Sequence, residues 1–131
     1  MRFYTALVHQ EGDSAYGLSF PDLPGCFSAA DGWDDIPAKA AEAFDLYFED
    51  APEPEPRPLS ALRADPAVAE ALANGATLLS VPYVAPDGMQ VRANISLDRG
   101  LLRAIDAVAK SRNMTRSSFL AALARRELTG R

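Results

Sequence analysis

The sequence contains very little cysteine and histidine. Its 131 residues include one cysteine and one histidine, which are Cys26 and His9. A single cysteine excludes a disulfide within the chain. One cysteine and one histidine cannot form a closed zinc site of such ligands within one subunit. We therefore expect neither a bound metal ion nor another cofactor.

Long apolar runs are also missing. No run approaches the ~18–20 apolar residues that a membrane-spanning helix needs. Residues 1–17 carry charged and polar side chains every few positions and lack the apolar centre of a signal peptide. These absences predict a cytoplasmic protein with no membrane partner.

The sequence does have a strong separation of charge along its length. The chain carries a net charge of −5. Residues 1–89 contain 15 acidic and 4 basic residues, a net charge of −11, whereas residues 90–131 contain 3 acidic and 9 basic residues, a net charge of +6. A basic segment attracts polyanions and an acidic segment repels them. The two parts of the chain are therefore expected to have different partners.

Turn signals and apolar periodicity predict an α+β domain over residues 1–87. Strands are expected over residues 2–10, 16–20 and 26–31, which would form a three-stranded meander. A helix is expected over residues 36–50, with Asp34 or Asp35 as its cap and Pro37 in its first turn. A further strand is expected over residues 76–84. Pro82 cannot donate a ladder hydrogen bond and is expected at a sheet edge or bulge.

Two further segments lie between that helix and the last strand. Residues 51–58, APEPEPRP, predict a stiff, exposed and extended connector. A short helix is expected from Pro66 to Ala73, ended by Asn74 and Gly75. The turn at residues 85–88 is the expected domain boundary, with a second domain over residues 88–131.

The second domain begins with a segment that alternates at the period of a β-strand. Residues 89–97 place apolar and polar side chains on opposite faces. The apolar face consists of Val91, Ala93, Ile95 and Leu97, and the polar face of Arg92, Asn94 and Ser96. Asp98 and Thr115 are expected to cap two following helices, which are separated by a left-handed residue at Asn113.

A unit of roughly forty residues is too small to bury this much apolar surface alone. Two copies could pair their strands antiparallel, with a dimerisation core that contains Ile95, Leu97, Ile105 and Phe119. The polar faces would then form a two-stranded ribbon, which fits the major groove of B-DNA. We expect Arg92 to read guanine, Asn94 to read adenine, and Ser96 to read less selectively. The start of the second helix is expected to bind phosphate through Thr115, Arg116, Ser117 and Ser118.

The segment "RANISLDRGLLRAIDAVAKSRNMTRSSFLAALARREL" resembles ribbon-helix-helix repressors. It is particularly similar to the C-terminal domain of HicB antitoxins in its NISLD start, the ID of its first helix and the RSSFL of its second. "YGLSFPDLPGCFSAADGWDDIPAKAAEAFDLYFED" is similar to the HicB N-terminal signature, with its PDLPGC turn, acidic glycine-containing turn and alanine-rich helix. The resemblance implies a partial ribonuclease-H-like fold for the first domain and a ribbon-helix-helix fold for the second.

The same resemblance implies two partners. One is HicA, a small basic toxin with a double-stranded-RNA-binding-like fold that cleaves messenger RNA. The other is operator double-stranded DNA at the promoter of the chain's own operon. The implied function is that of an antitoxin that neutralises the toxin and represses its own operon as a homodimer or tetramer.

Other functions fit parts of the sequence. A metal-dependent nuclease would need several converging carboxylates, and the tightest acidic cluster consists of Asp22, Asp31, Asp34 and Asp35. These residues lie in expected turns, where aspartate usually caps or turns the chain. A nucleophile and base formed by Cys26 and His9 is the other catalytic reading, and we expect no catalytic residue. The remaining alternative is a stand-alone ribbon-helix-helix repressor whose first domain senses a ligand or oligomerises.

Overall fold

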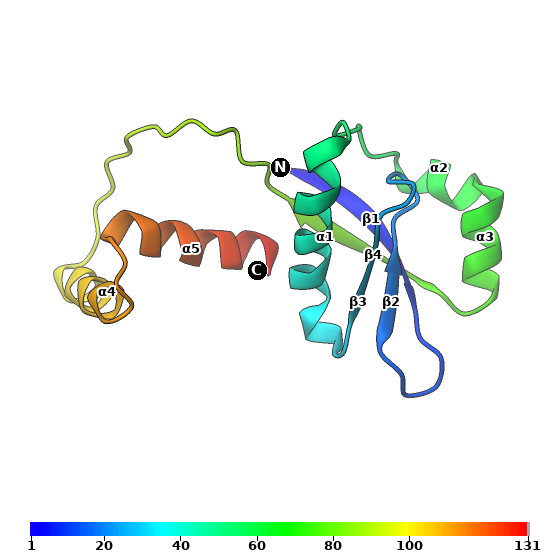
Figure 1. Cartoon of the computed structure of the whole chain (residues 1–131), viewed down its shortest axis with the longest axis horizontal. Helices are drawn as coiled ribbons and strands as arrows, with labels where there is room; N and C mark the ends of the chain where they lie inside the picture. The colour runs from blue at the N-terminus through cyan, green and yellow to red at the C-terminus, as the bar shows by residue number, and fades with distance from the viewer. Residues whose placement is uncertain (131) are drawn as a thin grey trace. The chain divides into compact units, whose positions relative to one another are not determined.

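The computed structural model describes residues 1–130. The described chain contains two compact units, Met1–Ala85 and Pro86–Leu128 (Figure 1). This break lies two positions before the boundary expected between Asp87 and Gly88, and the two domains with their separate roles stay a prediction. No helix of the described residues is long and apolar enough to cross a membrane.

The first unit is built on a four-stranded antiparallel sheet with the strand order β3-β2-β1-β4. Its strands are β1 (Arg2–His9), β2 (Tyr16–Ser19), β3 (Phe27–Ala30) and β4 (Thr77–Tyr83). The first three strands form the predicted meander, and β4 returns to pair with β1. Pro82 lies in β4 at the edge of the sheet, as predicted, where its missing N–H is tolerated.

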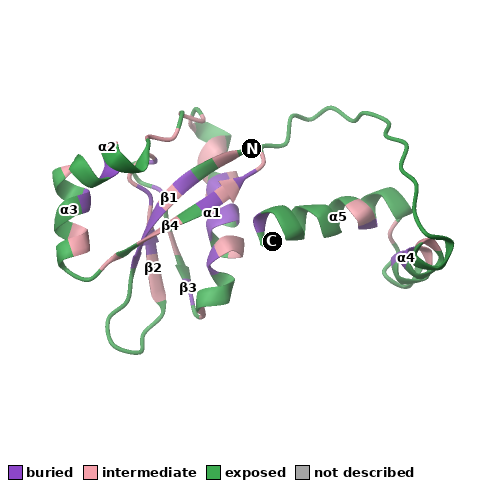
Figure 2. Ribbon diagram, turned by 180° about the vertical axis from the view of Figure 1, so that it is seen from behind, coloured by how far each residue is buried: buried purple, intermediate pink, exposed green. Residues whose placement is uncertain are grey.

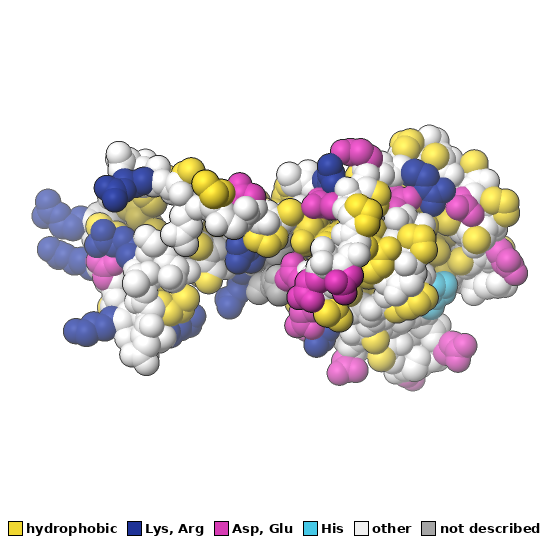
Figure 3. Space-filling view, turned by 45° about the horizontal axis from the view of Figure 1, so that its top comes forward, with side chains coloured by type: hydrophobic (Ala, Val, Ile, Leu, Met, Phe, Trp, Pro, Cys, Tyr) yellow, Lys and Arg dark blue, Asp and Glu magenta, His cyan; other side chains and the backbone are white. Residues whose placement is uncertain are grey.

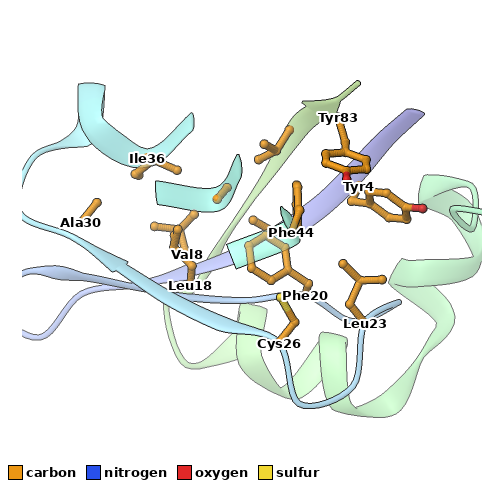
Figure 4. Packing of buried hydrophobic residues seen from close by; sticks show 13 residues of the cluster. Tyr4, Val8, Leu18, Phe20, Leu23, Cys26, Ala30, Ile36, Phe44 and Tyr83 are labelled. Atoms are coloured by element: carbon orange, nitrogen blue, oxygen red, sulfur yellow. The ribbon is translucent and has the colours of Figure 1, made fainter. Parts of the chain in front are cut away.

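One face of the sheet packs against helix α1 (Ile36–Asp50), which follows a short 3₁₀ helix, η1 (Trp33–Asp35). Phe44 projects from α1 into the centre of this core (Figure 4). The centre of its ring lies 4.8 Å from the centre of the Phe20 ring and 5.6 Å from the centre of the Tyr83 ring, and both pairs have edge-on geometry. The helix has the predicted bounds and Pro37 in its first turn, but its cap differs from the prediction. Asp35 stands at the N-cap position and its side chain makes no capping hydrogen bond.

Two short helices precede β4. Helix α3 (Pro66–Ala73) has the predicted bounds, and the side chain of Asp65 caps it by accepting from the amide of Ala67. Helix α2 (Leu59–Ala64) is not predicted by the sequence pattern. It buries Leu62 completely, so tertiary packing supports this single short turn of helix.

The proline-rich segment 51–58 has no regular structure, as predicted, but the expectation of an exposed connector is wrong. Several of its residues are only half exposed. The Tyr4 hydroxyl donates to the carbonyl of Pro54 at 2.6 Å, and Arg2 donates to the carbonyl of Glu53 at 2.8 Å. Proline has no amide donor, but the backbone carbonyls of such a segment remain available as acceptors, and the carbonyls of Glu53 and Pro54 attach the segment to β1.

The second unit consists of helices α4 (Arg99–Ser111) and α5 (Arg116–Thr129), preceded by an extended segment. Residues 89–97, for which a strand is expected, form no strand in the single chain, so that expectation is corrected for an isolated subunit. A β-strand needs a hydrogen-bonded neighbour, and this segment pairs with none of the strands in the described residues. It is exposed throughout (Figure 2). Asn113 adopts the predicted left-handed conformation, with φ of 55°.

Candidate functional site

The residues predicted to read DNA bases lie in the extended segment before α4. Arg92, Asn94 and Ser96 are all exposed. The side chain of Asp98 ends the segment by accepting a hydrogen bond from the amide of Leu101 at 3.1 Å, which confirms the predicted cap. The polar residues are therefore accessible and lie directly before a fixed helix start.

The start of α5 has the predicted cap. The Thr115 hydroxyl oxygen accepts a hydrogen bond from the amide of Ser118 at 3.1 Å and donates to the Ser118 hydroxyl at 2.9 Å. The first amides of a helix have no intrahelical acceptor, so this end carries a partial positive charge. Such an end can bind a phosphate group.

The side chain of Arg116 forms an ion pair that the sequence did not predict. Its Nε and Nη2 atoms each donate to one carboxylate oxygen of Asp106 at 2.8 Å. The hydrogen bond from Arg116 lowers the pKa of the Asp106 carboxyl. The sequence prediction assigned no role to Asp106, because nine residues, including the turn between α4 and α5, separate it from Arg116 along the chain.

Helices α4 and α5 enclose a small apolar cluster. Ile105, Ala109 and Phe119 are buried in it, and the guanidinium of Arg112 lies 5.7 Å from the centre of the Phe119 ring. Two of the four residues predicted for a dimerisation core, Ile105 and Phe119, are therefore buried within the single chain. The other two, Ile95 and Leu97, are 64% and 38% exposed.

The exposed strand-like segment and the start of α5 line a common cavity of about 340 Å³. Asn94 contributes from the segment, and Arg116 and Ser117 contribute from α5. Ile95, Leu97, Leu102 and Leu120 provide apolar walls. The structure thus brings three of the seven predicted DNA-binding residues to one place, beside an apolar surface.

The first unit carries most of the acidic side chains, whereas lysine and arginine side chains gather on the second (Figure 3). The acidic cluster considered for a nuclease, which includes Asp22, lies in the first unit. Asp22 accepts hydrogen bonds from the backbone amide of Arg57 at 2.9 Å and from its Nε at 2.5 Å. No group of three or more histidine, cysteine, aspartate or glutamate side chains within residues 1–130 is placed to hold a metal ion.

The alternative pair of Cys26 and His9 is not arranged as a nucleophile and base. His9 is exposed at the end of β1, whereas Cys26 is buried and its thiol contacts the carbonyl of Ala43 at 3.9 Å. Burial raises the pKa of the Cys26 thiol, so the thiolate form needed for attack is disfavoured.

Comparison with known proteins identifies the family. The family described as "HicB_like antitoxin of bacterial toxin-antitoxin system" matches residues 4–124. The chain belongs to this family. Its members act as antitoxins in bacterial toxin–antitoxin systems, which points to a regulator and not to an enzyme. A search of the curated proteins gives no significant match.

Solved structures of HicB antitoxins are similar to this chain. The crystal structure of the Burkholderia pseudomallei antitoxin HicB shares 32% identity over 98% of this chain and 97% of that chain, with a TM-score of 0.51. The crystal structure of antitoxin HicB3 shares 30% identity over 96% of this chain and 97% of that chain, with a TM-score of 0.51. A chain of the HicA3 and HicB3 toxin–antitoxin complex shares 27% identity, covers 63% of this chain and 99% of its own length, and has a TM-score of 0.52.

Proposed function

We propose that this HicB-like chain neutralises a HicA-type toxin through residues 1–87 and represses its own operon through residues 88–131. The family match carries this proposal, because it extends from residue 4 to residue 124 and so includes parts of both units. The similarity to a chain of a HicA3–HicB3 complex supports a HicA-type protein as the partner.

The charge of the first unit supports the neutralising role. Residues 1–85 contain 14 acidic and 4 basic residues, a net charge of −10, and the HicA-type toxin implied by the resemblance is small and basic. Complementary charge increases the rate of encounter and disfavours wrong partners. We propose that the acidic unit covers the RNA-binding and catalytic surface of the toxin.

The second unit supports operator binding as a dimer with a ribbon-helix-helix fold. Val91 and Ile95 are 90% and 64% exposed although both are large and apolar. They alternate with Arg92, Asn94 and Ser96, so pairing with the same segment of a second copy would bury one face and present the other. We propose Arg92, Asn94 and Ser96 as base-reading residues, with Thr115, Ser117 and Ser118 at a phosphate.

The two functions are tested in one experiment on the full chain. The neighbouring reading frame is expressed as the candidate toxin, and growth rescue is measured while it is induced. Operator binding is measured on the duplex upstream of the operon. Arg92→Ala and Asn94→Ala should each weaken specific binding by ~1–3 kcal/mol and should leave growth rescue unchanged.

The same experiment separates the stand-alone repressor from the antitoxin. A stand-alone repressor would bind the upstream duplex in the wild-type form and would fail to rescue growth. Loss of rescue in both the Arg92→Ala and Asn94→Ala variants would contradict the assignment of neutralisation to the first unit.

A further inference from the structure

The pairing of Arg116 with Asp106 has a geometry that phosphate can reproduce. The two N–H···O bonds are both 2.8 Å long and run in parallel from one planar guanidinium to one carboxylate. The same donor fork binds two oxygens of a phosphate group. Asp106 therefore occupies two guanidinium donors that are also suited to a phosphate group.

We propose that Asp106 is an intramolecular competitor of DNA phosphate, and that Arg116 exchanges Asp106 for a backbone phosphate when the operator binds. This inference rests on the proposed DNA-binding function of the second unit. In this role Asp106 lowers the affinity of the chain for DNA, and Arg116 contacts phosphate only in the complex with DNA.

The exposure of the pair favours exchange. The side chains of Arg116 and Asp106 are 54% and 44% exposed. Ion pairs between exposed side chains contribute little to stability. A phosphate at the start of α5 would add the attraction of the helix end to that of the guanidinium. Arg116 also lines the same cavity as Asn94, so this residue lies beside the proposed base-reading segment.

A purely structural role would be that of a clamp between α4 and α5. These helices already pack through Ile105, Ala109 and Phe119, which are all buried. Their contact does not depend on a hydrogen bond between exposed side chains. If Asp106 is a competitor, removal of its charge should raise the affinity for DNA. If the pair is a clamp, the same change should lower that affinity and the unfolding midpoint.

The experiment uses the full chain and the variants Asp106→Asn, Arg116→Gln and their combination. Glu127→Gln is the matched control, because it removes one exposed negative charge at the other end of α5. The probes are the duplex upstream of the operon and a duplex of scrambled sequence. Affinity is measured over a series of salt concentrations, and thermal unfolding midpoints report folding.

Asp106→Asn should raise affinity for both duplexes by about three- to tenfold at low salt, since it frees one cation for phosphate. Arg116→Gln should lower affinity and reduce the slope of log K against log salt by about one. The combined variant should behave like Arg116→Gln, because the gain requires the freed guanidinium. Glu127→Gln should change affinity by less than about twofold, since charges distant from the contact are screened.

Three results would overturn the competitor role. One is a gain in DNA affinity for Asp106→Asn that is no larger than the gain for Glu127→Gln. Another is a gain in DNA affinity that persists in the combined variant, which lacks the Arg116 guanidinium. The third is a loss of affinity in Asp106→Asn together with a lower unfolding midpoint, which would establish the clamp. If the wild-type chain binds neither duplex, the DNA-binding function itself fails, and the competitor role fails with it.

Discussion

Arg57 donates two hydrogen bonds to the carboxylate of Asp22, one from its backbone amide and one from its side chain. The Asp22 side chain is 8% exposed. A second bond from the Arg57 guanidinium reaches Asp65, the cap of α3, at 3.1 Å. One arginine thus joins the turn after β2, the proline-rich segment and the start of α3.

Replacement of Arg57 by alanine should destabilise the first unit. The backbone amide of residue 57 still donates to Asp22 in this variant, but the guanidinium bonds to Asp22 and Asp65 are lost. The loss of a hydrogen bond to a mostly buried carboxylate costs ~1–3 kcal/mol, which should appear as a lower midpoint in urea unfolding. Arg63→Ala is the control, because Arg63 is exposed in the neighbouring helix α2. Equal midpoints for the two variants would show that the side-chain hydrogen bonds of Arg57 do not stabilise the unit.

Asp65 should contribute to the acid sensitivity of the first unit. Hydrogen bonds from Arg57, and then from the Ala67 amide, lower the pKa of Asp65 in the folded chain. The carboxylate therefore stabilises the fold fully above the ordinary aspartate pKa of about 3.9. That contribution is lost as the pH falls from this value through the lowered pKa of the folded state.

Asp65→Asn isolates this effect, because asparagine can still accept the capping hydrogen bond. The difference in free energy of unfolding between wild type and Asp65→Asn should be largest near neutral pH and should shrink as the pH falls below about 4. Urea unfolding at several pH values measures it. A difference that is constant with pH would mean that the charge of Asp65 is unimportant.

The centre of the first core should be sensitive to truncation. Phe44 is completely buried and contacts the rings of Tyr4, Phe20 and Tyr83. Phe44→Ala should cost ~3–5 kcal/mol through lost burial and a cavity. Leu46→Ala on the same helix should change stability by less than about 0.5 kcal/mol, because Leu46 is 70% exposed. Comparable losses in the two variants would contradict the packing of α1 on the sheet.

The regular elements of the first unit could be predicted because their signals are local. The turn at Gly12, the proline–glycine turn after β2 and the Asp65–Pro66 start of α3 each determine the chain direction within a few residues. Helix α2 lacks a capping side chain at Pro58 and is supported by the burial of Leu62, which no local pattern reveals. The contacts of residues 53 and 54 with β1 span about fifty positions of the chain, so periodicity does not report them.

The predicted site was also incomplete for a physical reason. Caps such as Asp98 and Thr115 act within three residues and are visible in the sequence. The pairing of Asp106 with Arg116 depends on how α4 and α5 pack across the turn at Asn113. The strand expected over residues 89–97 depends on a neighbour that a single chain does not supply.

The last prediction separates self-association from DNA binding at two adjacent residues. Ile95 and Ser96 are both exposed in the single chain. In a ribbon formed by two copies, successive side chains point to opposite faces. Ile95 would then be buried between the copies, whereas Ser96 would face the DNA groove.

Ile95→Asp and Ser96→Asp each add one negative charge to the same segment. Ile95→Asp would place an unpaired charge in the dimer interface, which is strongly unfavourable, and should abolish both self-association and operator binding. Ser96→Asp should abolish operator binding by repulsion of phosphate and should retain the self-association of the wild type.

Sedimentation velocity over a range of protein concentrations measures association, and a gel shift on the upstream duplex measures DNA binding. Retained association in Ile95→Asp, or lost association in Ser96→Asp, would show that the two faces have been assigned incorrectly, because strand alternation allows only one of these residues to lie between the copies.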